Sequence, residues 1–170
     1  KIHFELGRID ELEQGASIFL YEVKDDYYAK EILHLLSGYF IERDQKEKAK
    51  PYLKQLVANY EKSVRQEELA SEKRIEQIVL IGEIYNDLDE YEKAERWLNH
   101  ALKLMETVED GRKKWQLRIL REKGFALFEL AQHSKALAAS LKVLYLDRSL
   151  SDKQRYDLNL RIASSYVKLN

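Results

Sequence analysis

The chain has 170 residues and a net charge of −1, and it contains six Gly, one Pro and no Cys. This charge creates no global field for nucleic acid or anionic membranes, and the lack of Cys excludes disulfides, thiolate catalysis and Cys-based zinc sites. Gly and Pro punctuate turns, so their scarcity indicates a nearly all-helical protein. Since no membrane-spanning apolar run or signal peptide is present, we expect a soluble, cytoplasmic protein.

The first part of the chain consists of segments with one apolar face at helical spacing. Residues 1–7 are expected to end one helix and residues 10–23 to form the next. Two further helices are expected at about 25–43 and 45–62. Pro51 lies too deep in the latter for the first-turn position, so we expect a kink or a later helix start.

The charged segment 61–77 is expected to hold two solvated helix ends joined by a turn near Gln66–Ser71. A disordered hinge is the alternative, which the many strong helix formers disfavour.

Residues 78–101 predict a helical hairpin, because small and apolar residues recur three and four apart on either side of a tight turn. Gly82 and Ala94 lie twelve residues apart, one on each helix, which lets the helices approach closely. Asp89 and Glu92 form a capping-box pattern at the start of the second helix.

A turn is predicted at Glu109–Gly111, followed by helices at about 112–130 and 133–147. Ser151 and Gln154 form a second capping-box pattern, which starts a final helix at 152–169.

The hairpins are copies of one another. Small residues at the same position of successive first helices lie 45, 42 and 39 residues apart, at Ser37, Gly82, Gly124 and Ala163. In the first three copies an alanine follows twelve residues later, at Ala49, Ala94 and Ala136. A period of this size is typical of a solenoid built from helix pairs.

A small residue, an aromatic three residues later (Tyr85 after Gly82) and alanines on the second helix resemble the tetratricopeptide repeat. The resemblance implies an all-α, right-handed solenoid of about eight helices. It comprises partial repeats at 1–23 and 152–170 and full repeats at about 25–62, 69–107 and 112–147, in one domain of residues 1–170. Both ends fall within helical pattern, so we expect a piece of a longer chain.

The spacing exceeds the usual 34 residues of this family. It is similar to the elongated repeats of peptide-pheromone receptor regulators of Gram-positive bacteria and to those of some scaffolding proteins. The period does not decide between them.

The resemblance implies a concave face lined by the first helix of each hairpin. Arg118, Arg121, Phe125 and Phe128 are expected on that face, beside Glu83 and Asn86 of the preceding first helix. Cations suit a carboxylate and rings suit an apolar side chain, so these residues predict a peptide site. The alternative is a charged, solvated face whose two rings pack against the next hairpin.

Asp157, Leu160, Ser164 and Lys168 are expected to face inward on the final helix. The carboxylate-holding set of the chaperone-binding family members is absent, which disfavours a chaperone tail as ligand.

The residues indicate no catalytic site. The four histidines have no ligand spacing between them, no Gly-rich phosphate loop is present, and no Ser or Thr is framed as a nucleophile. We therefore expect no enzymatic activity, metal or cofactor. Arg112–Lys114 is a basic run beside Trp115, but acidic runs adjoin it, so we expect no direct nucleic-acid binding.

These observations predict a non-enzymatic module that binds a protein or peptide, as the ligand-binding or oligomerisation part of a bacterial regulator of transcription. The alternative is a structural scaffold or dimerisation segment without a small ligand, and a homo-oligomer is compatible with either. A phosphatase-type regulator would need catalytic residues on a helical bundle that this sequence does not contain.

Overall fold

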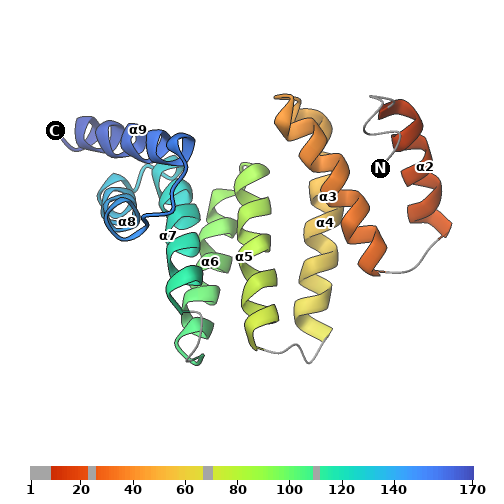
Figure 1. Cartoon of the computed structure of the whole chain (residues 1–170), viewed down its shortest axis with the longest axis horizontal. Coiled ribbons are helices and arrows are strands. Elements are labelled where there is room, and N and C mark those ends of the chain that lie inside the picture. Colours follow the sequence, from red (N-terminus) through yellow and green to blue (C-terminus); the bar gives the residue numbers. More distant parts are fainter. Residues whose placement is uncertain (1–8, 23–25, 67–70, 109–111) are drawn as a thin grey trace. The chain divides into compact units, whose positions relative to one another are not determined.

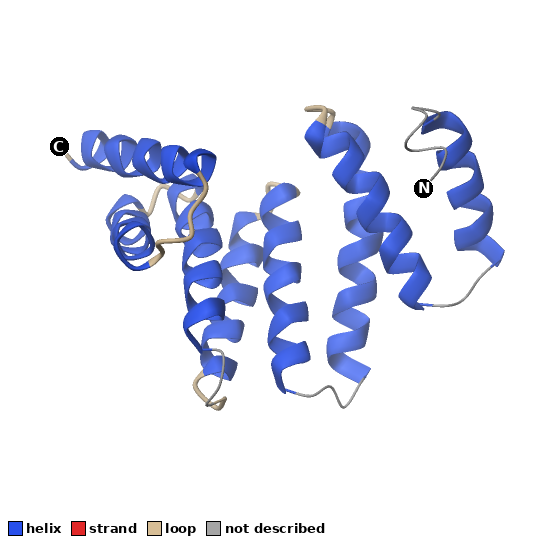
Figure 2. Cartoon of the chain, in the orientation of Figure 1, coloured by secondary structure: helices blue, strands red, loops and turns tan. Residues whose placement is uncertain are grey.

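The computed structural model describes residues 9–22, 26–66, 71–108 and 112–170. In these residues the structure has eight α-helices and no strand (Figure 2). The helices are α2 (Ile9–Glu22), α3 (Asp26–Glu42), α4 (Lys46–Gln66), α5 (Ser71–Asp87), α6 (Tyr91–Met105), α7 (Arg112–Glu129), α8 (His133–Leu146) and α9 (Asp152–Leu169). The all-α repeat fold expected from the sequence is confirmed. The expected helix at 1–7 and the turns within 67–70 and 109–111 lie outside the described residues.

The chain divides into two compact units, Lys1–Asn59 and Tyr60–Asn170. In the first unit, α2 packs on α3, and the Tyr52 hydroxyl donates to Glu13 Oε1 over 2.5 Å. In the second, α5 pairs with α6 and α7 with α8, while α6 packs on α7 and α8 on α9 (Figure 1). The prediction of one domain over 1–170 stays a prediction.

Three turns between paired helices share one backbone conformation. The second residue after the helix has a left-handed φ, of 57° at Asp44, 62° at Asp89 and 56° at Ala131. The next N–H bonds back to a carbonyl five residues earlier, Gln45 to Phe40 over 2.8 Å, Glu90 to Tyr85 over 2.9 Å and Gln132 to Leu127 over 2.9 Å. This is the Schellman type of helix end, and it recurs at the spacing of the small residues.

The two predicted capping boxes have different outcomes. The box of Ser151 and Gln154 is confirmed, since each side chain bonds to the backbone N–H of the other. The box of Asp89 and Glu92 is wrong, because Glu90 is the residue before α6 and makes no side-chain cap. Asp89 instead adopts the left-handed conformation of the turn, and its carboxylate accepts a hydrogen bond of 2.8 Å from the Tyr91 hydroxyl.

The later helix start expected from Pro51 is also wrong, because α4 begins at Lys46 with Pro51 inside it. A kink there stays a prediction.

Gly82 is needed for the close approach of α5 and α6. A Cβ atom added to it would lie 2.6 Å from Leu98 Cγ, and Leu98 is completely buried. Ala94, which the sequence pairs with Gly82, is also completely buried. None of the described helices is long and apolar enough to cross a membrane.

Candidate functional site

The first helices of successive hairpins form one continuous face of the second unit, because α5 contacts α7 and α7 contacts α9. All six residues that the sequence places in the candidate peptide site lie on this face, Glu83 and Asn86 on α5 and the other four on α7. The structure separates these six residues into two groups with different surroundings.

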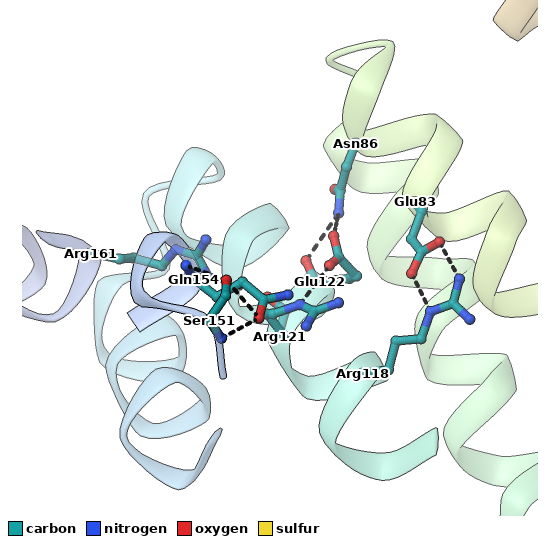
Figure 3. Close-up of polar contacts among 8 residues, drawn as sticks. All are labelled: Glu83, Asn86, Arg118, Arg121, Glu122, Ser151, Gln154 and Arg161. Atoms are coloured by element: carbon teal, nitrogen blue, oxygen red, sulfur yellow. Dashed lines mark hydrogen bonds and ion pairs between the residues drawn. The ribbon is translucent and has the colours of Figure 1, made fainter. Parts of the chain in front are cut away.

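The first group joins α5 to α7. Arg118 donates from Nε to Glu83 Oε1 and from Nη2 to Glu83 Oε2, both over 2.6 Å (Figure 3). This bidentate geometry raises the pKa of Arg118, mainly through the hydrogen bond to Glu83. Asn86 Nδ2 donates to the backbone oxygen of Glu122 over 3.1 Å. These side chains are occupied in holding two helices together, a role that the sequence does not reveal.

Glu122 lies at the centre of this network, and sequence reasoning missed it. Its carboxylate accepts from Arg121 Nε over 3.1 Å and from Asn86 Nδ2 over 3.4 Å. Burial raises the pKa of Glu122, and the negative charge of Glu83 adds to this effect, while the bonds to Arg121 and Asn86 oppose it. Asn86 Oδ1 is buried without a hydrogen-bond partner in the described part of the chain.

The second group lines a cavity of about 550 Å³ between α7 and α9, here called the α7–α9 cavity. Both helices supply polar and apolar side chains to it. Its lining residues are Arg121, Glu122, Phe125, Phe128 and Glu129 from α7, and Gln154, Asp157, Leu158, Leu160, Arg161 and Ser164 from α9. Arg121, Phe125 and Phe128 of the predicted site are thus brought together with Asp157, Leu160 and Ser164.

The rings of the cavity are held by neighbours. Phe125 packs edge-on against Tyr91 at 5.8 Å between ring centroids, and Phe128 packs against His133 at 5.4 Å. Both phenylalanines are half-buried, so each ring keeps part of its surface open. The alternative prediction, that the two rings pack against neighbouring residues, is therefore correct for only part of each ring surface.

Arg161 is the second residue that sequence reasoning missed. It reaches from α9 toward α7, where Nη1 donates to the Arg121 backbone oxygen over 3.2 Å (Figure 3). Its guanidinium carbon lies 5.2 Å from the centroid of the Phe125 ring. Burial lowers the pKa of Arg161, while nearby carboxylates, led by Glu122, oppose this effect.

A signal for both missed residues was present in the repeat. Leu80, Glu122 and Arg161 each lie two residues before the small residue of their first helix. The position changes from apolar to acidic to basic in successive copies, and the structure places both charged copies in the lining of the α7–α9 cavity.

A second cavity of about 930 Å³ lies where α7 meets the segment joining α8 to α9. Arg121 lines both cavities, and Arg118 lines only this one. The described residues contain no cluster of three or more side chains that could hold a metal ion.

Comparison with known proteins supports the repeat assignment. Residues 76–149, which extend from within α5 to beyond α8, match the family described as tetratricopeptide repeat. No curated protein sequence matches the chain.

Two solved structures cover 98% of this chain with 19% sequence identity. Both are of a putative kinesin light chain with nearly identical TPR-like repeats from Podosopora anserina. One aligns with a TM-score of 0.58 over 82% of its own length. The other, a variant of the same protein, aligns with a TM-score of 0.60 over 81%. At this identity the likeness shows the fold alone.

Proposed function

We propose that this chain is a non-enzymatic interaction module whose α5–α7–α9 face binds an extended peptide segment of a partner protein. The observation that carries the proposal is the α7–α9 cavity, where the half-open rings of Phe125 and Phe128 lie beside charged side chains. Tetratricopeptide repeats in general mediate contacts between proteins, which supports the same conclusion.

The cavity has the properties of a binding site for one or two side chains. Its volume lies within the range of about 300–1,000 Å³ that is typical of ligand pockets. Burying an apolar side chain of the peptide against the rings contributes about 25 cal/mol for each Å² of apolar surface removed from water. Polar groups from both helices fix the direction of the peptide, since a charge-assisted hydrogen bond needs a defined geometry.

We further propose that this binding belongs to a bacterial regulator, in which the peptide controls a second function of the same protein. The support is the repeat spacing of 45, 42 and 39 residues, which resembles that of the peptide-pheromone receptors. The test is the sequence of the natural polypeptide. A helix-turn-helix segment in it would support the regulator, and a long array of further repeats would contradict it.

The test of peptide binding is selection from a random peptide library displayed on phage, followed by titration of the selected peptides by calorimetry. Phe128→Ala should weaken binding roughly ten- to a hundredfold, because it removes one wall of the cavity. Tyr166→Ala is the matched control, since this ring is 50% exposed on α9 and lies outside the cavity lining.

The thermal transition of each variant is recorded beside its affinity. Failure to select any peptide with a Kd below about 100 μM contradicts the proposal, as does unchanged affinity in Phe128→Ala. A lowered transition temperature with intact binding assigns the Phe128 ring to the fold alone.

One observation favours the alternative of a dimerisation segment. Apolar side chains on α9 are strongly exposed, with 75% of Val167 and 50% of Leu169 open to solvent. Light scattering from about 1 to 200 μM protein tests this alternative. A dimer that disappears in Val167→Glu supports it, and a monomer throughout this range contradicts it.

A further inference from the structure

We infer that Arg161 is the anchor of the α7–α9 cavity and receives a carboxylate of the partner peptide, while Phe125 and Phe128 receive the apolar side chain beside that carboxylate. This inference rests on the proposed function and deepens it. It assigns the anchoring role to a residue of α9 in place of the two α7 arginines that the sequence singles out.

Each of the two α7 arginines already donates to a carboxylate of this chain. Arg118 gives two of its N–H groups to Glu83, and the side chain of this arginine lines only the other cavity. Arg121 donates to Glu122. A ligand carboxylate at either arginine would compete with an existing partner, and displacing that partner would leave a partly buried acid without its cation.

Arg161 is in the opposite situation. Its guanidinium has five N–H donors, and the structure gives it one hydrogen bond, to the Arg121 backbone oxygen. Within the described residues no carboxylate lies at ion-pair distance from it. The cation has thus lost much of its hydration without gaining a charged partner, so a carboxylate that enters the cavity meets an available donor that is poorly hydrated.

The surroundings of Arg161 define what else the ligand carries. The guanidinium carbon lies 5.2 Å from the centroid of the Phe125 ring, so a carboxylate bound to Arg161 would lie beside an aromatic surface. Phe128 and Leu160 supply apolar walls of the same cavity. Gln154 Oε1 is bonded to Ser151 N over 3.0 Å, so the amide N–H groups of Gln154 are the end that can donate to a ligand. A carboxylate next to an apolar side chain fits this arrangement.

Two exposed acids also line the cavity, and their charge allows the sign of the ligand's charge to be tested. Glu129 and Asp157 are exposed, and neither pairs with Arg161 within ion-pair distance. Their negative charge opposes an anionic ligand and favours a cationic one, although solvent screens exposed charges. Removing one of them should therefore strengthen the binding of a carboxylate and weaken the binding of an ammonium group. The sign of this change identifies the ligand.

The experiment uses three small probes that share a phenyl ring and a short linker: 3-phenylpropionate, 3-phenylpropionamide and 3-phenylpropylammonium. Each is titrated into the 170-residue chain, and binding is followed by shifts of backbone amide resonances of α7 and α9. We expect the carboxylate to bind at least fivefold more tightly than the amide. Arg161→Gln should remove this preference, and Asp157→Asn should strengthen carboxylate binding two- to threefold.

The controls separate charge from fold. Arg155→Gln removes an exposed arginine of the same helix that lies outside the cavity lining, and it should preserve the preference. Arg161→Lys keeps the charge without the planar fork and should give an intermediate preference. If Arg161→Gln broadens the whole spectrum, Arg161→Lys and Asp157→Asn still decide the question, because both keep a cation at this position.

Three results overturn the inference: equal binding of carboxylate and amide, a preference that survives in Arg161→Gln, or tightest binding of the ammonium probe with weakening in Asp157→Asn. Its failure is distinguishable from failure of the proposed function. Library peptides that bind wild type and Arg161→Gln equally leave peptide binding in place and remove only the role of Arg161. A library that yields no peptide contradicts the proposed function itself.

Discussion

The hairpins α5–α6 and α7–α8 have the same backbone plan but fill it with different side chains. Where Gly82 of α5 makes room for the buried side chain of Leu98, Gly124 of α7 faces Ala139 and Ser140. Ser140 lies sixteen residues after its glycine, as Leu98 does. In the α5–α6 hairpin a large apolar side chain, Leu98, thus packs against the glycine. In the α7–α8 hairpin the residues that face the glycine are small.

Gly124 of the second hairpin lies next to the candidate site. An added Cβ at Gly124 would lie 3.5 Å from Arg161 Nη1, so this glycine borders the side chain that we assign as anchor. Two residues earlier α7 carries Glu122, where α5 carries Leu80. One hairpin therefore places a buried leucine against its glycine, while the next carries a charged residue beside its glycine, and that residue lines the cavity.

Alanine at each glycine should reveal the difference between the two hairpins with the largest effect. Gly82→Ala should lower the free energy of unfolding by about 1–3 kcal/mol, since its Cβ would overlap the completely buried side chain of Leu98. Gly124→Ala should change it by less than about 0.5 kcal/mol, because the contact of 3.3 Å with Ala139 Cβ offsets the better helix propensity of alanine. Urea unfolding followed by circular dichroism measures both.

A double variant identifies the cause. Leu98→Ser copies the second hairpin, and it should cost less in the Gly82→Ala background than alone, by about 1 kcal/mol or more. Equal losses in the two glycine variants would show that the hairpins do not differ in packing in the way described.

The repeat fold was predictable because it depends on short-range pattern. The small residues Gly82 and Gly124, the apolar spacing around them and the Ser151–Gln154 box are visible in the sequence and reappear in the structure. The Asp89 box was not predicted correctly, because an Asp before a helix suits both a cap and a left-handed turn, and the Schellman bond of Glu90 to Tyr85 selects the turn.

The candidate site was predictable only in part. Helical spacing places Arg121, Phe125 and Phe128 on one face, and the structure brings them to one cavity. Spacing along one helix does not reveal that Glu83 occupies Arg118, or that Arg161 arrives from α9, because these contacts join residues 35 and 40 positions apart.

The turns of the same two hairpins offer the next test. Ala131 holds a left-handed φ without help from its side chain, a conformation that costs an L-residue about 1–2 kcal/mol. Ala131→Gly should therefore raise the free energy of unfolding by about 1 kcal/mol, less the extra chain entropy of glycine. Asp89→Gly should give no gain, because Asp tolerates this conformation and its carboxylate binds the Tyr91 hydroxyl. Matched urea curves decide, and a larger gain at Asp89 would contradict this account.

The smallest expected effect concerns Glu122, the acid that replaces Leu80 in the second hairpin. Burial raises its pKa in the folded state above the ordinary value of about 4.3, so the folded chain holds this proton more strongly than the unfolded chain. Its contribution to stability is therefore fully present below the ordinary pKa and is lost as the pH rises through the raised folded pKa. Glu122→Gln keeps the shape without a titrating group, so the variant should gain stability relative to wild type as the pH rises from 4 to 7.

At pH 7 the net change should stay within about 1 kcal/mol, because loss of the partly exposed bond to Arg121 opposes the relief of a buried charge. Thermal unfolding of both proteins at half-unit steps of pH measures the slope, and Glu129→Gln on the same helix controls for deletion of an exposed carboxylate. A difference between Glu122→Gln and wild type that falls with rising pH would mean that Arg121 and Asn86 stabilise the ionised carboxylate more than burial penalises it. The second hairpin would then gain stability from its charged network where the first gains it from packing.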